Sequence, residues 1–502
     1  MKIKKSCLLA LSLLVSSSFL FFQSSTIYAA GTPCSITPVL TEADLNTCLA
    51  EAPTDNSEFD ITIGANFNIT TTKNITAGNN ITLTSSDPNN PATLTRNTGL
   101  GGRLFNVNIA TPNTATLTID SVILDGNNPT TAAANRQLIY TVGTGTATLN
   151  LTGNTVLKNN NTTSEGGAIS SQSSGGSLNI SGSVQIINNT ANNGGGVYIG
   201  TGSTLNMSGN AIISGNSATG YSGGVTINVG GAFIMNGGTI SGNSTTSISS
   251  GGVRVVGSFI MNGGEISGNT SANNGGGVTV AGATSTFVMN GGTISGNTAI
   301  NNGGGVEINA GGTFTMNNGT ISNNTASGEF GGGGVMVNIS STGVFLMNGG
   351  EISGNTSTSN GGGVSIIIGG TAILASGNII NNTATKDGGG VFTVDYNLLF
   401  VEAPMMFSGN RAASYSLERD PAYDAVYASN IQGTNWTTPF TQGYNNFDIN
   451  HDYENIPGVP GTGGAPFGSG NTITSAFSMI ASGIVIAVIF AGLALLKKSR
   501  YI

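Results

Sequence analysis

Charged side chains are scarce in this chain of 502 residues. Only 8% of the residues are Asp, Glu, Lys or Arg, and the formal net charge is −8. An acidic chain with so few basic residues lacks the positive surface that binds nucleic acid, so nucleic acid is excluded as a partner. A single histidine, His451, cannot form a histidine-based nucleophile relay or a zinc site. We therefore assign no metal site and no cofactor.

The scarcity of charge also bears on catalysis. Between Lys158 and Asp387 the charged residues are Glu165, Arg254, Glu265, Glu307, Glu329, Glu351 and Lys386. A glycosidase needs two carboxyl groups within about 10 Å of each other. Glu265 and Glu351 hold equivalent positions but lie three repeats apart, about 14 Å in a stacked structure. No catalytic residue is assigned.

Two further groups of charged residues are not assigned to catalysis. Arg254 and Glu307 both follow a Gly-Gly-Val triplet, and we interpret them as solvated surface charges. Glu418, Asp420 and Asp424 lie in the non-repeat C-terminal part, and whether two of them form a catalytic pair of carboxyl groups stays open. The chain is therefore expected not to be an enzyme. A carbohydrate-active β-helix lyase or glycosidase stays the alternative.

Glycine, in contrast, is abundant, and it accompanies a repeat. The 78 glycines argue against helical repeats. Phe-x-Met-Asn recurs, with its phenylalanines at Phe233, Phe259, Phe287, Phe314 and Phe345 and its asparagines at Asn236, Asn262, Asn290, Asn317 and Asn348. The valines of the preceding Gly-Gly-Val triplets, Val225, Val253, Val278, Val306 and Val335, are 28, 25, 28 and 29 residues apart. A period in this range indicates a stacked array.

One repeat reads as a triangular coil of three short strands. Apolar side chains alternate in Val253-x-Val255 and in Phe259-x-Met261, and Ile266 adds a third inward point. A single coil buries too little apolar surface to be stable, so coils must stack. Stacking would align the phenylalanines in a column and the asparagines in a ladder. Crossover connections favour the right hand, so we predict an all-β, right-handed parallel β-helix of about 12 coils over residues 60–397.

Both ends of such a solenoid need caps, because they expose open strand edges. Residues 31–59 are predicted to cover the first coil. They contain a capped helix start at Thr41 and two cysteines, Cys34 and Cys48, for which a disulfide is expected, with two free thiols as the alternative. Residues 398–455, where aromatic and charged residues return, are predicted to be the last coil and a C-terminal cap. A separate binding module is the alternative there.

The two termini predict export and anchoring. Residues 1–30 have a basic start, an apolar run and a small-residue cleavage site, as in a secretory signal peptide. Residues 456–475 form a Gly/Pro/Ser linker. Residues 476–496 carry no charge and are long enough to cross a bilayer as one helix. The basic tail, residues 497–502, is then cytoplasmic, and nearly the whole protein lies outside the cell.

The repeats resemble those of a known group of proteins. Gly166-Gly167-Ala168-Ile169, followed by the five Phe-x-x-Asn motifs, resembles the GGA[ILV]/FxxN repeats of polymorphic outer-membrane proteins and adhesin-like β-helix proteins. The resemblance covers about residues 60–410 and implies a β-helix fold and adhesion. Those outer-membrane proteins end in a transporter barrel, whereas this chain is expected to end in one helix.

The linker holds a second resemblance. Val459-Pro460-Gly461-Thr462-Gly463 resembles the LPxTG motif of sortase sorting signals, with valine in place of leucine. It implies that a sortase cysteine attacks the carbonyl between Thr462 and Gly463 and transfers the chain to a cell-wall amine. A plain linker, with the helix as a permanent membrane anchor, stays open.

Together these features predict a protein of the cell surface, anchored through its C-terminus to the plasma membrane or the cell wall. The array would present a polar, nearly uncharged surface of Thr, Ser and Asn to a host, a neighbouring cell or a glycan, as an adhesin-like or structural protein. The glycan or protein ligand is not identified by the sequence.

Overall fold

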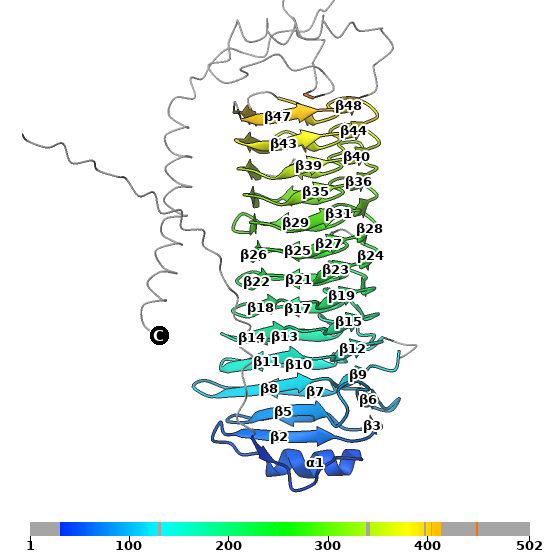
Figure 1. The fold of residues 1–502 in the computed structure, drawn as a ribbon, viewed down its shortest axis with the longest axis vertical. Helices are drawn as coiled ribbons and strands as arrows, with labels where there is room; N and C mark the ends of the chain where they lie inside the picture. Colours follow the sequence, from blue (N-terminus) through cyan, green and yellow to red (C-terminus); the bar gives the residue numbers. More distant parts are fainter. Residues whose placement is uncertain are drawn as a thin grey trace, which may run out of the picture. The chain divides into compact units, whose positions relative to one another are not determined.

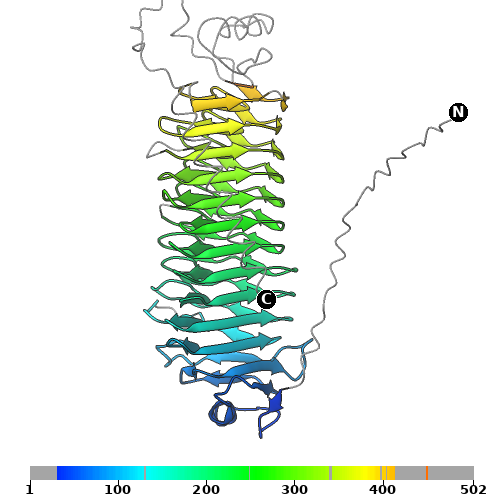
Figure 2. The ribbon, with the colours of Figure 1, turned by 90° about the vertical axis from the view of Figure 1, so that its left-hand side faces the viewer.

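The computed structural model describes residues 31–128, 132–247, 249–337, 342–395, 398–402, 404–412 and 448–449. The chain divides into two units, Met1–Asn450 and His451–Ile502, and the second lies outside the described residues. The first unit is an all-β parallel solenoid of right-handed type with about 13 turns (Figures 1 and 2). The predicted parallel β-helix is confirmed, with about 13 turns in place of 12, whereas the C-terminal transmembrane helix that was predicted with it is not supported.

Three parallel sheets run the length of the described stack and a fourth begins at β16, and each takes one strand from successive turns. Sheet A comprises β1 (Thr32–Pro33), β2 (Glu58–Ile63), β5 (Asn80–Ser85), β8 (Thr114–Asp120), β11 (Thr146–Thr152), β14 (Ser177–Ile180), β18 (Thr204–Met207), β22 (Ala232–Met235), β26 (Ser258–Met261), β30 (Thr286–Met289), β34 (Thr313–Met316), β38 (Val344–Met347), β42 (Thr371–Leu374) and β46 (Leu399–Val401). Sheet B comprises β3 (Phe67–Ile69), β6 (Thr93–Arg96), β9 (Ile123–Asp125), β12 (Val156–Lys158), β15 (Gln185–Ile187), β19 (Ile212–Ser214), β23 (Thr239–Ser241), β27 (Glu265–Ser267), β31 (Thr293–Ser295), β35 (Thr320–Ser322), β39 (Glu351–Ser353), β43 (Gly377–Ile380) and β47 (Met405–Ser408).

Sheet C completes the turns, and sheet D adds a fourth strand to those from β16 onward. Sheet C comprises β4 (Lys73–Ile75), β7 (Phe105–Asn108), β10 (Ile139–Gly143), β13 (Ile169–Ser173), β17 (Val197–Ile199), β21 (Val225–Ile227), β25 (Val253–Val255), β29 (Val278–Ala281), β33 (Val306–Asn309), β37 (Val335–Val337), β41 (Val364–Ile366) and β45 (Val391–Thr393). Sheet D comprises β16 (Thr190–Ala191), β20 (Ser217–Ala218), β24 (Ser244–Thr245), β28 (Thr270–Ser271), β32 (Thr298–Ala299), β36 (Thr325–Ala326), β40 (Thr356–Ser357), β44 (Thr383–Ala384) and β48 (Arg411–Ala412).

Most turns therefore have four strands, and the predicted three-stranded coil is wrong. From β14 onward the chain runs from sheet A to sheet B, then through sheet D to sheet C. The sheet D strands are only two residues long, with one inward side chain such as the buried Ala299 of β32. Two residues are too few for an alternating pattern to stand out in the sequence, which is why this strand was missed.

The phenylalanines form the predicted column in the core. Their rings stack with centroid distances of 4.7, 4.7, 4.6 and 5.2 Å from Phe233 to Phe345, and each ring is fully buried. Parallel pairing in register places each ring directly above its equivalent, for example Phe287 on Phe259. Each pair of stacked rings therefore adds to the apolar area buried in the hydrophobic core.

A second column, which the sequence analysis did not predict, is a ladder of buried asparagines. It consists of Asn160, Asn189, Asn216, Asn243, Asn269, Asn297, Asn324, Asn355, Asn382 and Asn410. In the repeated rung, the Oδ1 of one asparagine accepts both the backbone N–H and the Nδ2 of the asparagine one turn earlier, as Asn297 does from Asn269 at 2.9 Å each. The Nδ2 also donates to a carbonyl of an earlier turn, for Asn297 that of Ile266. The side-chain amides are thus satisfied without water.

The two ends of this buried ladder meet opposite charges. The Oδ1 of Asn160 accepts from the Arg96 guanidinium at 3.3 Å, and the Nδ2 of Asn410 donates to the Asp448 carboxylate at 3.0 Å. From Asn189 onward every side-chain amide donates toward the C-terminal end, so their dipoles add along the stack. Arg96 faces the carbonyl end of the ladder and Asp448 the N–H end, each with the stabilising sign.

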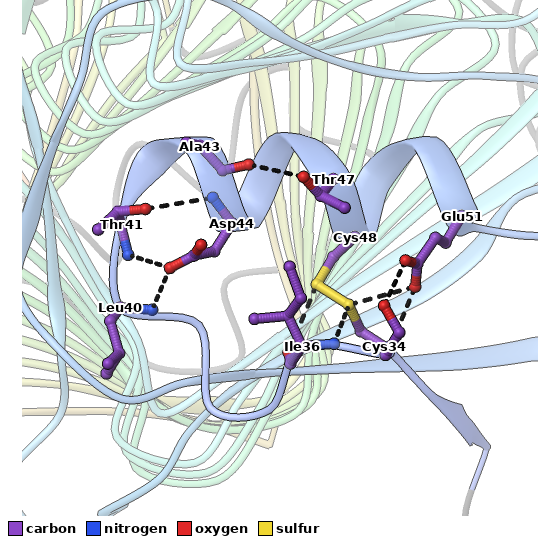
Figure 3. Close-up of a disulfide and its surroundings, with 10 residues drawn as sticks. Cys34, Ile36, Leu40, Thr41, Ala43, Asp44, Thr47, Cys48 and Glu51 are labelled. Atoms are coloured by element: carbon purple, nitrogen blue, oxygen red, sulfur yellow. Dashed lines mark hydrogen bonds between the residues drawn. A yellow bond between two sulfur atoms is a disulfide. The ribbon is translucent and has the colours of Figure 1, made fainter.

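The N-terminal cap lies at the open end of the first turn, beside β2 (Figure 1), and Figure 3 shows its helix and disulfide. Its helix α1 (Glu42–Glu51) begins at Thr41, whose side chain accepts from Asp44 in a capping box. A disulfide joins Cys34 to Cys48 of α1. Strand β1 also pairs with β2, so the cap extends sheet A as well as covering the core.

An ion pair fixes α1 to the first strand of sheet C. Lys73 of β4 is buried, and its ammonium donates to Glu42 and to Asn46 of α1. Burial raises the pKa of Glu42, but hydrogen bonds from Lys73, Thr70 and Thr71 outweigh burial and lower that pKa to about 2. The contact is therefore a pH-dependent part of the cap.

We expect this contact to be lost in acid. Because the folded pKa of Glu42 lies below its usual value of 4.5, its contribution is complete above that value and falls away as the pH drops toward 2. With solvent screening the loss is about 1 kcal/mol. In Glu42→Gln the Tm should fall less between pH 5 and pH 2.5 than in the parent. Glu265→Gln is the control and should retain the parent's slope; equal slopes for Glu42→Gln and the parent would contradict the assignment.

Candidate functional site

The outward face of sheet C is where the structure differs most from the expected surface. Glu307, interpreted as a solvated charge, is 1% exposed, and Thr279 in the preceding turn is 2% exposed. The loop before each strand folds back over this position, so that a Cβ built on Gly303 would lie 3.0 Å from the Cβ of Glu307. The Glu307 carboxylate accepts from Asn274 in such a loop at 2.9 Å. The interpretation of Glu307 as solvated is wrong.

Arg254 lies in the same column of outward-facing residues on sheet C as Thr279 and Glu307, and it is half-buried rather than free in solvent. Its guanidinium carbon lies 4.0 Å from the centre of the Tyr221 ring, which comes from the loop before β21. Burial lowers the pKa of Arg254, and Tyr221 and Tyr198 oppose that shift. The interpretation of Arg254 as a solvated charge is therefore also wrong.

Large and small side chains alternate along this part of the column. Parallel pairing places Tyr140, Ser170, Tyr198, Thr226 and Arg254 one above another in successive strands from β10 to β25. Ser170 and Thr226 are buried, whereas the two tyrosines and Arg254 are half-buried and reach the surface. At about 4.8 Å per strand, the large side chains recur about every 9.6 Å.

A second arginine lies at the N-terminal end of this column. The Arg103 guanidinium carbon is 3.7 Å from the centre of the Tyr140 ring. Three side-chain carbonyl oxygens hold it there, from Gln137 at 3.3 Å, Asn106 at 3.4 Å and Asn135 at 3.3 Å. A guanidinium has five N–H groups, so two remain for a ligand.

The other end of the column holds polar atoms that lack partners. Thr226 Oγ1 and Arg254 Nε are buried and have no hydrogen-bond partner among the described residues. Buried polar atoms are nearly always satisfied, and an exception calls for a cause such as water or ligand. Tyr198 is the neighbour of Thr226 on its other side in the column, and burial raises the pKa of Tyr198, Glu165 raises it further and Arg254 lowers it.

We call this set the aromatic face, and it consists of Arg103, Tyr140, Glu165, Tyr198, Tyr221 and Arg254. It lies on the outward side of β10, β13, β17, β21 and β25, which follow one another in the stack (Figure 1). The aromatic face was not predicted from the sequence, because the tyrosines were not aligned with Arg254. The sequence does contain a pattern that aligns them, since Tyr198 and Arg254 both directly follow the valine of a Gly-Gly-Val triplet.

The other predicted residues lie elsewhere. The asparagines of Phe-x-Met-Asn form an exposed ladder beside sheet A, with side-chain amides joined at 2.8, 2.9, 2.8 and 2.9 Å from Asn236 to Asn348. Glu265 and Glu351 lie in sheet B with Thr293 and Thr320 between them, three strands apart. That is about 14 Å, too far for a glycosidase pair.

Several predictions fall on residues outside the described part. They are the signal peptide 1–30, the motif Val459–Gly463, the helix 476–496, the tail 497–502 and the acidic residues Glu418, Asp420 and Asp424. Within the described ranges, no helix is long and apolar enough to cross a membrane. The described residues also contain no cluster of His, Cys, Asp or Glu suited to a metal ion.

No protein-family model, no curated protein and no solved structure matches the chain.

Proposed function

We propose that this protein is an adhesin-like or structural rod of the cell surface, and that the aromatic face is where it contacts a glycan. The observation that carries the proposal is the grouping of Tyr140, Tyr198, Tyr221, Arg103 and Arg254 on one face of a solenoid with few other charges. Aromatic rings and arginines are enriched in binding sites because they combine apolar area with fixed donors. A rigid stack would hold them at constant spacing.

A glycan and matrix-protein binding array, probed with the full-length protein, tests this function. We expect saturable binding, with the bound glycan recovered uncut. Tyr198→Ala should reduce that binding, and Ile260→Ala, a half-buried outward position on sheet A, should not. Release of shortened glycan would instead favour the alternative, a carbohydrate-active enzyme.

We also propose anchoring through the C-terminus, by way of the VPGTG motif and the helix 476–496. The sequence order of motif, apolar span and basic residues supports a sortase signal. If sortase acts at this motif, Thr462→Ala should keep the protein in the membrane fraction and out of the cell wall. The wall-linked form of the parent should end at Thr462 by intact-mass analysis. A parent chain that keeps Lys497 and Lys498 at steady state would contradict cleavage and leave the helix as the anchor.

A further inference from the structure

We propose that the aromatic face binds a polyuronate, an extended chain of pyranose rings with a carboxylate on every ring, laid along the stacking axis of sheet C. The inference rests on the proposed function and names its ligand class. Three features of the face lead to it, namely the spacing of the large side chains, the unpaired donors, and the sign and position of the charges.

The spacing matches an extended sugar chain. Successive strands advance about 4.8 Å, which is close to the advance of one ring in an extended, equatorially linked chain. Alternate rings of such a chain turn over, so the first and third rings present the same face. Tyr140 and Tyr198 are two strands apart in one column, with the small Ser170 between them. Both tyrosines can therefore pack against the apolar C–H face of alternate rings.

The donors select carboxylates. Arg103 keeps two N–H groups beyond its three protein contacts, and Arg254, whose guanidinium lies over the Tyr221 ring, has no hydrogen-bond partner for its Nε among the described residues. A guanidinium pairs with a carboxylate through two parallel N–H···O bonds, which a neutral hydroxyl cannot reproduce. The two guanidinium groups lie over Tyr140 of β10 and Tyr221 before β21, about three strands or 14 Å apart. A polymer with a carboxylate on every ring offers one carboxylate to each arginine.

The remaining groups of the face fit hydroxyls. Thr226 Oγ1 lies between Tyr198 and Arg254 in the column and lacks a partner among the described residues. The Glu165 carboxylate, near Tyr198, can accept from ring hydroxyls. Because Thr226 is buried, a water held beneath the bound sugar would satisfy its Oγ1. The two arginines of this face outnumber Glu165 in a chain of net charge −8, so an acidic polymer meets positive charge here.

Titration of the full-length protein with oligomannuronates of two to eight rings tests the inference. Affinity should rise with length until the chain spans from Tyr140 to Arg254, four strands or about 19 Å, and then level off. Fully methyl-esterified oligomers should bind at least tenfold more weakly. Arg254→Gln should weaken the acid form about tenfold and the ester little, and Tyr198→Ala should weaken both. Ile260→Ala is the matched control, and each variant is first checked for an unchanged Tm.

The outcomes separate the two proposals. Equal affinity for acid and ester, or no effect of Arg254→Gln on the acid form, overturns the polyuronate assignment. If array binding to some other glycan is still lost in Tyr198→Ala, the proposed function stands without that assignment. If all array binding survives in both Tyr198→Ala and Arg254→Gln, the aromatic face is not the contact surface and both proposals fall.

Discussion

Replacing Asn297 by leucine is expected to destabilise the solenoid by about 3–5 kcal/mol, although the two side chains are similar in size. Asn297 Oδ1 accepts the backbone N–H and the Nδ2 of Asn269, and leucine leaves both of these buried donors without a partner. Each orphaned donor costs about 1–3 kcal/mol. Thermal and denaturant unfolding followed by circular dichroism would measure the loss.

The exposed asparagine ladder provides a control within the same turn. Asn290 also bonds its neighbours, at 2.9 Å to Asn262 and 2.8 Å from Asn317, but it lies in solvent. In Asn290→Leu water can replace the lost bonds, so the cost should stay below about 1 kcal/mol. If the two variants unfolded together, burial of the Asn297 ladder would not be what makes it stabilising.

The second large effect concerns the phenylalanine column. Phe287→Asp should cost at least about 4 kcal/mol, since it removes a stacked ring and leaves a carboxylate in an apolar core. Phe287 is fully buried, with Phe259 at 4.7 Å and Phe314 at 4.6 Å between ring centres. The same unfolding measurement applies, and aggregation on expression would be the extreme form of the effect.

Thr286→Asp is the matched control, because Thr286 is exposed and adjacent to Phe287 in β30. It should change the stability by less than about 0.5 kcal/mol. Thr279, which alternation alone would place in solvent on sheet C, is buried and so cannot serve as the control. A large loss in Thr286→Asp would show that the inward and outward faces of sheet A are misassigned.

Periodicity predicts those features in which one residue type recurs at one period. The column from Phe233 to Phe345 and the ladder from Asn236 to Asn348 both follow from that rule, because parallel strands in register place equivalent residues together. Ser-Gly-Asn, by contrast, reads as turn chemistry, so Asn297 and its equivalents were not recognised as buried. Their amides lie against the glycines before sheet C, since a Cβ built on Gly277 would lie 3.0 Å from Asn297 Nδ2, and no local pattern encodes that contact.

At the candidate site, too, the sequence pattern predicts the direction of side chains but not their burial. Alternation predicts correctly that Arg254 and Glu307 point outward from the coil, but it does not tell what covers them. The covering depends on the loops before sheet C, which carry the positive-φ glycines Gly275 and Gly303 and fold back onto the strand. An outward position is therefore not the same as an exposed one in this solenoid. The meeting of Arg254 with Tyr221, from different turns, likewise required the structure.

Hydrogen–deuterium exchange with and without saturating oligomannuronate octamer would show directly whether a ligand lies along one face of the stack. We expect new protection in the peptides that carry residues 135–143, 165–173, 193–199, 219–227 and 253–255. Peptides of sheet B and sheet D, and the exposed ladder around Asn290, should exchange unchanged. The octamer should be recovered intact by mass spectrometry. Protection on sheet B or D with sheet C unchanged, or recovery of shortened sugar, would contradict the account.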